Sequence, residues 1–108
     1  MQLACVRGNV VASIKDHGLS NLKLLLLESV DAADPDPDPT RATSRKDAVP
    51  NIYVAIDLIG AGVGEIVLVA HGSAAREAAD SQHVPTDAAV VAIVDVVHIN
   101  GSSTFIKR

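Results

Sequence analysis

Apolar residues recur at short intervals along most of this chain, a pattern that predicts short strands rather than long helices. In one segment Ile52, Val54 and Ile56 alternate with other residues, so they are expected on one side of a strand. The unbroken Leu24–Leu27 run predicts a strand that is covered on both faces. The expected strands are residues 3–13, 22–29, 52–59, 66–71 and 89–97, with a short tail strand at 104–106.

Glycine and polar residues punctuate these strands and predict how they connect. Gly8, inside the first strand, predicts a bulge or a sharp bend, and residues 17–21 predict a turn. Ser73 is expected to cap a helix of about two turns that ends at Ala79, because a serine hydroxyl accepts an orphan backbone N–H. The fold class expected from this order is mainly β: a small five-stranded OB-like Greek-key barrel with one short α-helix.

The whole chain, residues 1–108, is expected to form a single domain, since this length suffices for one hydrophobic core. Residues 31–50 are the irregular section, and their Asp34–Pro39 repeat of Asp-Pro is stiff and unable to join a sheet. We interpret them as an exposed loop rather than a domain boundary, because neither flank is long enough to fold alone. Residues 80–87, which contain Pro85, are expected to form a second loop.

The amino-acid composition indicates the cellular compartment of the protein and whether its subunits associate. Hydrophobic residues make up 48% of the chain although aromatic residues make up only 2%, and so much aliphatic content on a small domain indicates burial between subunits. No apolar run is long enough to span a bilayer, and no signal peptide is expected at the start. The single Cys5 cannot form an internal disulfide, which fits a reducing cytoplasm.

The charge balance argues against nucleic acid as the main partner. The formal net charge is −4, and the chain has one Tyr, one Phe and no Trp. A single-strand site on an OB-like barrel needs stacking aromatic side chains in a basic groove. We therefore expect no nucleic-acid binding, in spite of the predicted fold.

The motif Gly60-Ala61-Gly62-Val63-Gly64-Glu65 stands between two expected strands and is the most distinctive feature of the chain. Glycine permits backbone conformations and close approaches that a side chain forbids. A phosphate-binding loop is not expected here, because a strand follows in place of a helix and Glu65 adds a negative charge. The motif instead predicts a backbone that packs tightly against another surface.

No catalytic, cofactor or metal site is expected. The four histidines are dispersed without metal-ligand spacing. A nucleophile at Ser73 beside His71 lacks the Gly-x-Ser-x-Gly elbow. Charged residues in apolar segments need partners, so Arg76 is expected to pair with Glu65 or Asp57, within or between subunits. The alternative is that these charges lie in solvent at strand ends.

Several stretches together closely resemble the bacterial microcompartment vertex proteins of the EutN/CcmL type. The resemblance covers nearly the whole length, and its specific signature is Gly-Ala-Gly-Val-Gly-Glu at 60–65 followed by Gly-Ser-x-Ala-Arg at 72–76. Further matching stretches are residues 3–15, 22–26, 55–59, 67–69, 85–89 and 93–95.

This resemblance implies a structural, non-catalytic protein without a required cofactor. It implies a β-barrel subunit that assembles into a pentamer, caps the vertices of a shell in the cytoplasm, and contacts hexameric shell proteins. By resemblance, Gly60, Ala61, Gly62, Val63, Gly64 and Glu65 are expected at subunit contacts around the central axis, with Asp57, Ser73 and Arg76 as structural ion-pair or interface residues.

The residues alone leave two other functions possible. One is a free-standing oligomeric OB-like binding module for a small anionic ligand or single-stranded nucleic acid. The other is a small hydrolase that uses Ser73 and His71.

Overall fold

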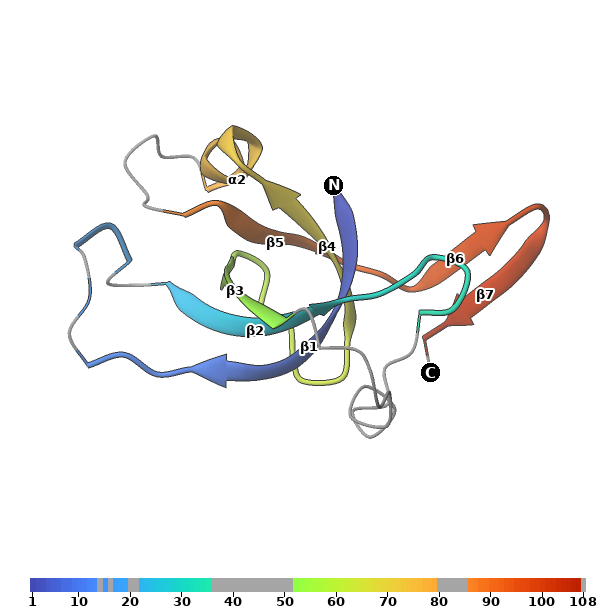
Figure 1. Cartoon of the computed structure of the whole chain (residues 1–108), viewed down its shortest axis with the longest axis horizontal. Coiled ribbons are helices and arrows are strands. Elements are labelled where there is room, and N and C mark those ends of the chain that lie inside the picture. The colour runs from blue at the N-terminus through green and yellow to red at the C-terminus, as the bar shows by residue number, and fades with distance from the viewer. Residues whose placement is uncertain (14, 16, 20–21, 36–51, 80–85, 108) are drawn as a thin grey trace.

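Five strands close into a barrel (Figure 1). The computed structural model describes residues 1–13, 15, 17–19, 22–35, 52–79 and 86–107. Around the barrel the strand order is β1-β2-β3-β5-β4, and β4 pairs back onto β1. All neighbouring pairs are antiparallel except β3 and β5, which run parallel. The barrel strands are β1 Gln2–Val10, β2 Lys23–Ser29, β3 Ile52–Asp57, β4 Ile66–His71 and β5 Ala88–Ile93. The predicted mainly β barrel with one short helix is confirmed.

Small aliphatic side chains fill the barrel. Every second residue of a strand points inward, and across the β1–β2 ladder the paired Val6 and Leu27 both reach the core. Leu25 and Leu27 are buried, while Leu24 and Leu26 on the outer face of β2 are half-buried. The core cluster consists of Ala4, Val6, Leu25, Leu27, Ala55, Ala61, Val67, Val69, Ala88 and Val90. Tyr53 and Ile93, both partly buried, pack against this cluster, and a narrow five-stranded barrel has little interior volume for larger side chains.

A bulge bends the first strand, as the sequence predicts. The pairing register between β1 and β2 shifts between Val6 and Gly8. A Cβ added at Gly8 would lie 3.6 Å from Leu26 Cδ1, in ordinary van der Waals contact, so the glycine here serves the bulge rather than a steric gap. β1 ends at Val10, three residues before the predicted end of the strand at Ser13.

The alternating side chains of β3 do share one side, but that side is the outside of the barrel. Ile52 and Val54 are each 46% exposed, whereas the intervening Ala55 and the last residue, Asp57, are buried. Ile56 on the same outer side is buried because the helix packs over it. β3 therefore presents an apolar strip to the surface.

One short helix, α2 Ser73–Ala78, packs on the outside of the barrel against β4 and β5. Ala75 is its buried residue and contacts the cluster of Ile56 and Ala89. The prediction that Ser73 caps this helix is wrong. Gly72 occupies the cap position with φ 62°, and no side chain bonds the helix N-terminus. The Gly72 N–H donates to the Asp87 carbonyl at 2.8 Å, which fixes the turn between β4 and α2.

The predicted long last strand, residues 89–97, is wrong, because the chain leaves the barrel within it. β5 ends at Ile93, and the Val94 N–H donates to the Ile66 carbonyl at 2.8 Å, after which the chain turns away. β6 Val96–Ile99 and β7 Ser102–Ile106 then form a separate two-stranded antiparallel sheet. The predicted tail strand at 104–106 is confirmed as the end of β7. We call residues 96–106 the arm, which projects from the barrel at the right of Figure 1.

The remaining connections are described in part. The predicted turn at 17–21 contains a 3-10 helix, η1 His17–Leu19. In the predicted loop at 31–50, residues 31–34 form a turn in which the Ala33 N–H donates to Asp31 Oδ1, and Pro35 is buried. The Thr104 hydroxyl of the arm donates to the Ala32 carbonyl at 2.7 Å. Residues 36–50 of that loop, and 80–85 of the second predicted loop, lie outside the described residues.

Candidate subunit interface

Asp57 organises the first half of the glycine loop, which we define as residues 60–65. Its carboxylate accepts hydrogen bonds from the N–H groups of Ile59, Gly60 and Ala61, at distances of 3.0 to 3.1 Å. The side chain sits at the end of β3, and Asp57 is only 8% exposed. Three N–H donors stabilise the negative charge of a carboxylate, so this side chain needs no cationic partner. Asp57 is therefore a loop-folding residue, and the predicted ion pair with Arg76 within the subunit is not formed.

The second half of the glycine loop is fastened to β1. The Gly64 N–H donates to the Val6 carbonyl at 2.8 Å, and the Val6 N–H donates to the Glu65 carbonyl at 3.0 Å. The Gly62 N–H donates to Glu65 Oε1 at 2.7 Å. Gly60 and Gly64 have φ values of 82° and 91°, which favour glycine because other residues are strained there. The loop is thus a preformed part of the barrel rather than a flexible link.

Glu65 also joins the loop to the arm. Lys107 Nζ, one residue beyond β7, donates to Glu65 Oε2 at 2.7 Å. This bond, with the backbone N–H of Gly62, holds the pKa of the Glu65 carboxyl below its usual value, and Glu65 raises the pKa of Lys107. The prediction that Arg76 pairs with Glu65 within the subunit is wrong, because Lys107 takes that position.

A groove of about 560 Å³ runs between the glycine loop and β7. Its floor includes Ile66, which is fully buried, while Val63 and Ile106 on its walls are 69% and 63% exposed. We call this region, without the buried Ile66, the loop–arm surface. It consists of Val63, Gly64, Glu65, Thr104, Phe105, Ile106 and Lys107. An exposed valine and isoleucine beside a groove are typical of a protein contact rather than of a catalytic site.

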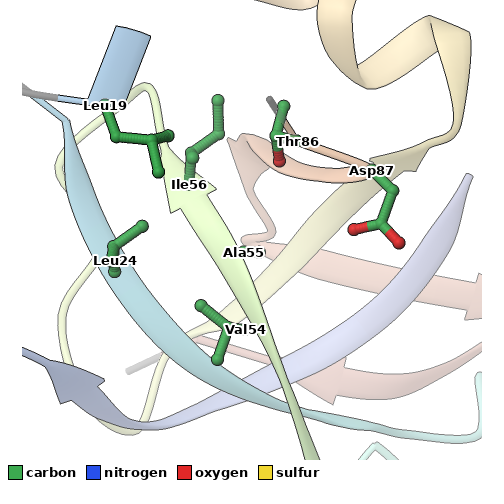
Figure 2. Close-up of a pocket in the computed structure, with 7 residues that line it drawn as sticks. All are labelled: Leu19, Leu24, Val54, Ala55, Ile56, Thr86 and Asp87. Atoms are coloured by element: carbon green, nitrogen blue, oxygen red, sulfur yellow. The ribbon is translucent and has the colours of Figure 1, made fainter. Parts of the chain in front are cut away.

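A second hollow, the β2–β3 pocket, lies on the outside of the barrel and measures about 230 Å³ (Figure 2). Aliphatic side chains from η1, β2 and β3 make its walls, and Thr86 and Asp87 lie toward one side. The described residues that line it are Leu19, Leu24, Val54, Ala55, Ile56, Thr86 and Asp87. None of these described lining residues is cationic, so they offer an anionic ligand no charged partner.

Among the described residues, a buried ion pair joins β1 and β2. Arg7 Nε donates to Glu28 Oε2 at 2.8 Å, with the two side chains 11% and 10% exposed. Arg7 also donates to the Sγ of Cys5, which is fully buried. Arg76, in contrast, lies half-buried on α2 and forms no ion pair with another described residue. Its predicted pairing between subunits stays a prediction.

His71 and Ser73 do not form a catalytic pair. The His71 ring lies 3.0 Å from Gln2 Oε1 through Nε2 and packs 5.7 Å from the ring of Tyr53. Ser73 is exposed at the start of α2 and makes no hydrogen bond with His71. Within the described ranges, no three His, Cys, Asp or Glu side chains gather as metal ligands. No helix among the described residues is sufficiently long and apolar to cross a membrane.

Comparison with known proteins places the chain in a family. The family model described as "Ethanolamine utilisation protein EutN/carboxysome" matches residues 1–95. The chain belongs to the EutN/CcmL family. The resemblance seen in the sequence is therefore confirmed.

Named relatives of this family member match over the full length. The carboxysome shell vertex protein CcmL of Synechococcus elongatus is 39% identical over 108 residues, covering 100% of this chain and 97% of that protein. The bacterial microcompartment shell vertex protein EutN of Escherichia coli strain K12 is 41% identical over 107 residues, covering 99% and 100%.

Solved structures of the family share the fold of this chain. A structure named "Ethanolamine utilization protein, EutN" superposes with a TM-score of 0.81, at 39% identity and full coverage of both chains. The GrpN pentameric microcompartment shell protein from Rhodospirillum rubrum has a TM-score of 0.67 and 36% identity, covering 92% of this chain and 98% of that one.

The features that the sequence pattern does not predict lie in the arm of this EutN/CcmL member or directly after it. The pattern gives no sign that Lys107 holds Glu65, and it predicts β5 and β6 as one strand. The signal that reveals the arm is Asn100-Gly101, whose φ values are 52° and 80°. An Asn-Gly pair between extended residues is the strongest short-range hairpin signal, because a tight hairpin turn needs positive φ at both positions.

Proposed function

We propose that this chain is a structural shell protein whose copies form a cyclic pentamer, and that the pentamer caps the vertices of a bacterial microcompartment in the cytoplasm. The observation that carries the proposal is the full-length match to proteins named as shell vertex proteins, together with the likeness to pentameric GrpN. A closed shell requires such a part, because a layer of hexagonal tiles stays flat unless fivefold corners are inserted.

The surface of the subunit supports this assembly. A cyclic ring is built from heterologous contacts, so each subunit must present two different faces. The loop–arm surface and the β2–β3 pocket are two distinct apolar regions, and Val63 and Val54 leave substantial apolar area exposed on each. Since exposed aliphatic area on a small subunit favours association, both regions fit a role in the ring.

We further propose that the glycine loop lies at or near the contacts around the central axis. A Cβ built at Gly60 or Gly64 meets nothing within 4 Å, so the space beside these residues is free in the subunit. A neighbouring backbone is able to enter such a space, and a bulky residue would exclude it. Ser73 and Arg76, on the surface of α2, are proposed as further contact residues, with Arg76 paired to a carboxylate of the adjacent subunit.

The proposed role includes no catalysis, no cofactor and no nucleic acid, and its partners are hexameric shell proteins. The support for excluding nucleic acid is chemical, since the chain has a net charge of −4 and only one Tyr and one Phe to stack on bases. Co-expression with hexameric shell proteins is expected to give closed shells, whereas shells made without this chain should stay open or extend as sheets. A salt-sensitive gel shift with single-stranded DNA at physiological ionic strength would instead favour the OB-like binding module.

The native mass of the purified protein tests the ring directly. Light scattering coupled to size exclusion, or native mass spectrometry, should give five times the 11.2 kDa mass of one chain. A stable monomer at micromolar concentration would contradict the proposed assembly.

Gly62→Val tests the position of the glycine loop. In the subunit, a Cβ at residue 62 would lie 3.4 Å from Glu65 Oε1, a tight contact that a flexible side chain relieves. We therefore expect a folded protein, destabilised by roughly 1 kcal/mol, that no longer forms pentamers because the added methyl groups obstruct neighbouring subunits. Circular dichroism checks the fold and native mass checks the ring; an unchanged pentamer would show that the loop lies away from the contacts.

A further inference from the structure

The turn at the tip of the arm, at the far right of Figure 1, consists of Asn100 and Gly101. Ile99 of β6 pairs directly with Ser102 of β7, so these two residues alone form the loop between the strands. Both are exposed, and their φ values are 52° and 80°. In a two-residue hairpin loop the ladder bond comes from the residue after the loop, which leaves the Gly101 N–H outside the ladder. The Gly101 nitrogen therefore lies unbonded to the ladder, next to the Asn100 side chain.

An asparagine followed by a glycine contains a pair of atoms that react with each other. The Gly101 nitrogen loses its proton and attacks Cγ of Asn100, the new C–N bond closes a succinimide ring, and the side-chain nitrogen leaves as ammonia. Water then opens the ring at either carbonyl carbon and gives aspartate or isoaspartate at residue 100. A side chain at residue 101 would hinder the attack. A Cβ built at Gly101 meets no atom within 4 Å, so the attacking nitrogen has open space around it.

The closed turn holds these two atoms apart. Asn100 is in the left-handed region, where ψ is roughly +30° to +60° and the next backbone nitrogen therefore lies trans to Cβ. Ring closure needs that nitrogen on the same side as Cβ, so the Cα–C bond of Asn100 must rotate. Because this rotation breaks the turn, the arm must open at its tip before the atoms react.

The tip of the arm opens at low cost because the arm has no core of its own. Two antiparallel strands alone are marginally stable in water. The bonds described above that fasten the arm lie nearer its base: the Lys107 N–H donates to the Asp95 carbonyl at 2.7 Å, and the Thr104 hydroxyl donates to the Ala32 carbonyl. A segment with exposed hydrogen bonds and few buried contacts opens locally without unfolding the rest of the protein.

We propose that Asn100 is a site of spontaneous deamidation, and that the reaction makes the arm a one-way chemical switch. The closed arm is protected, and an arm that opens is converted. Both products add a negative charge to a chain whose net charge is already −4. Isoaspartate also inserts one carbon atom into the backbone of the two-residue loop, so the pairing of Ile99 with Ser102 is lost and the arm stays open. The inference is independent of the proposed shell role.

Peptide mapping of the wild-type protein, after incubation at slightly alkaline pH in water enriched in heavy oxygen, tests the site. Trypsin separates residues 77–107, which contain Asn100, from residues 8–15, which contain Asn9. Asn9 is the matched internal control, because it is also exposed but lies within β1 and precedes the β-branched Val10. We expect conversion of Asn100 to be about tenfold faster than that of Asn9, or more, with heavy oxygen and isoaspartate in the product. Equal rates, or an intact Asn100, would overturn the proposal.

Thr104→Val tests whether the arm must open first. The variant removes the bond to the Ala32 carbonyl without touching the reacting atoms, and Thr104→Ser is the matched control that keeps a hydroxyl. Loss of one hydrogen bond should raise the open population, and with it the rate at Asn100, about fivefold. Urea below the unfolding transition should raise the rate of wild type in the same way, which keeps the test valid if Thr104→Val does not fold. A rate that neither change alters would show that the closed turn itself reacts.

Hydrogen exchange on aged protein tests the consequence for the arm. Asn100→Gly is the control, because glycine keeps the positive φ but carries no amide to react. We expect the arm of aged wild type, once isoaspartate has formed, to exchange about tenfold faster than that of fresh protein, or more, while β1 and β2 stay unchanged. Aged Asn100→Gly should exchange like its fresh sample. An isoaspartate-containing arm that exchanges like the fresh arm would show that the modification is not a switch.

Discussion

Individual side chains hold the glycine loop in shape, and the Asp57 carboxylate fixes the first half of the loop. Sequence reasoning recognised that a charged residue at the end of an apolar strand needs a partner, and it assigned Arg76. The partner is the backbone itself: the N–H groups of Ile59, Gly60 and Ala61 point at one carboxylate. An aspartate followed three and four residues later by small residues, here Gly60 and Ala61, forms this local arrangement readily, because its short side chain reaches the nearby N–H groups.

Asp57→Ala should therefore lower the free energy of unfolding by about 2–4 kcal/mol, since it leaves the loop N–H groups without their charged acceptor. Asp57→Asn keeps one acceptor oxygen and should lose less than half as much. Urea unfolding at a fixed subunit concentration measures both. Equal losses in the two variants would show that the negative charge, rather than hydrogen bonding, holds the loop.

The Glu65–Lys107 bond predicts a pH response in the acid range. Because the pKa of Glu65 in the folded subunit lies below its ordinary value of 4.5, the bond contributes stability above that value and loses it as the pH falls through the lowered folded value. Carbon-13 NMR of the Glu65 carboxyl should show the lowered pKa, and Lys107→Met should raise it toward 4.5. An unchanged titration in Lys107→Met would mean that the loop N–H groups alone set the pKa.

For the secondary-structure elements, the local hydrophobic pattern predicts where the strands lie well. It predicts less well which side of each strand faces the core. Strand β2 was expected to be covered on both sides, and the structure bears this out only in part, with Leu25 and Leu27 in the core and Leu24 half-buried outside. The alternation in β3 was recognised, but its apolar side is the outer one. In a barrel of small inward residues, Ala55 suffices for the core face, so hydrophobicity alone does not reveal which side of a strand points inward.

The arm depends on its turn. Gly101 has φ 80°, where a β-branched residue is strained, so Gly101→Val should fray β6 and β7 while leaving the barrel folded. Hydrogen exchange read by mass spectrometry should show at least tenfold faster exchange in the arm and little change in β1 and β2. Gly101→Asn, which tolerates positive φ better, is the matched control. Equal exchange in both variants and wild type would mean that the turn residue does not limit the arm.

For the whole molecule, assembly and folding are expected to be coupled. A ring that binds folded subunits raises the stability of the folded state by mass action, so the thermal midpoint should rise with protein concentration. We expect a rise of several degrees over a hundredfold concentration range for wild type, and no such rise for Gly62→Val, which we expect not to form pentamers. Differential scanning fluorimetry with an extrinsic dye, across a dilution series, provides the measurement. A concentration-independent midpoint for wild type would argue against a reversible ring.

The sequence by itself determined the mainly β barrel, the short helix and the bulge at Gly8, because short-range periodicity and glycine placement directly restrict the backbone. Its 60–65 motif and the Gly-Ser-x-Ala-Arg that follows also identified the family, which the comparisons confirmed. Only the tertiary structure decided which partners the charges take. Glu65 binds Lys107, a residue 42 positions away, because folding brings these two distant segments together. Asp57 binds N–H groups only two to four residues away, but the turn that aims these groups at its carboxylate forms in the folded barrel. Only Asp95 interrupts the apolar residues between β5 and β6, so the sequence does not reveal that the two strands separate where Val94 bonds to Ile66.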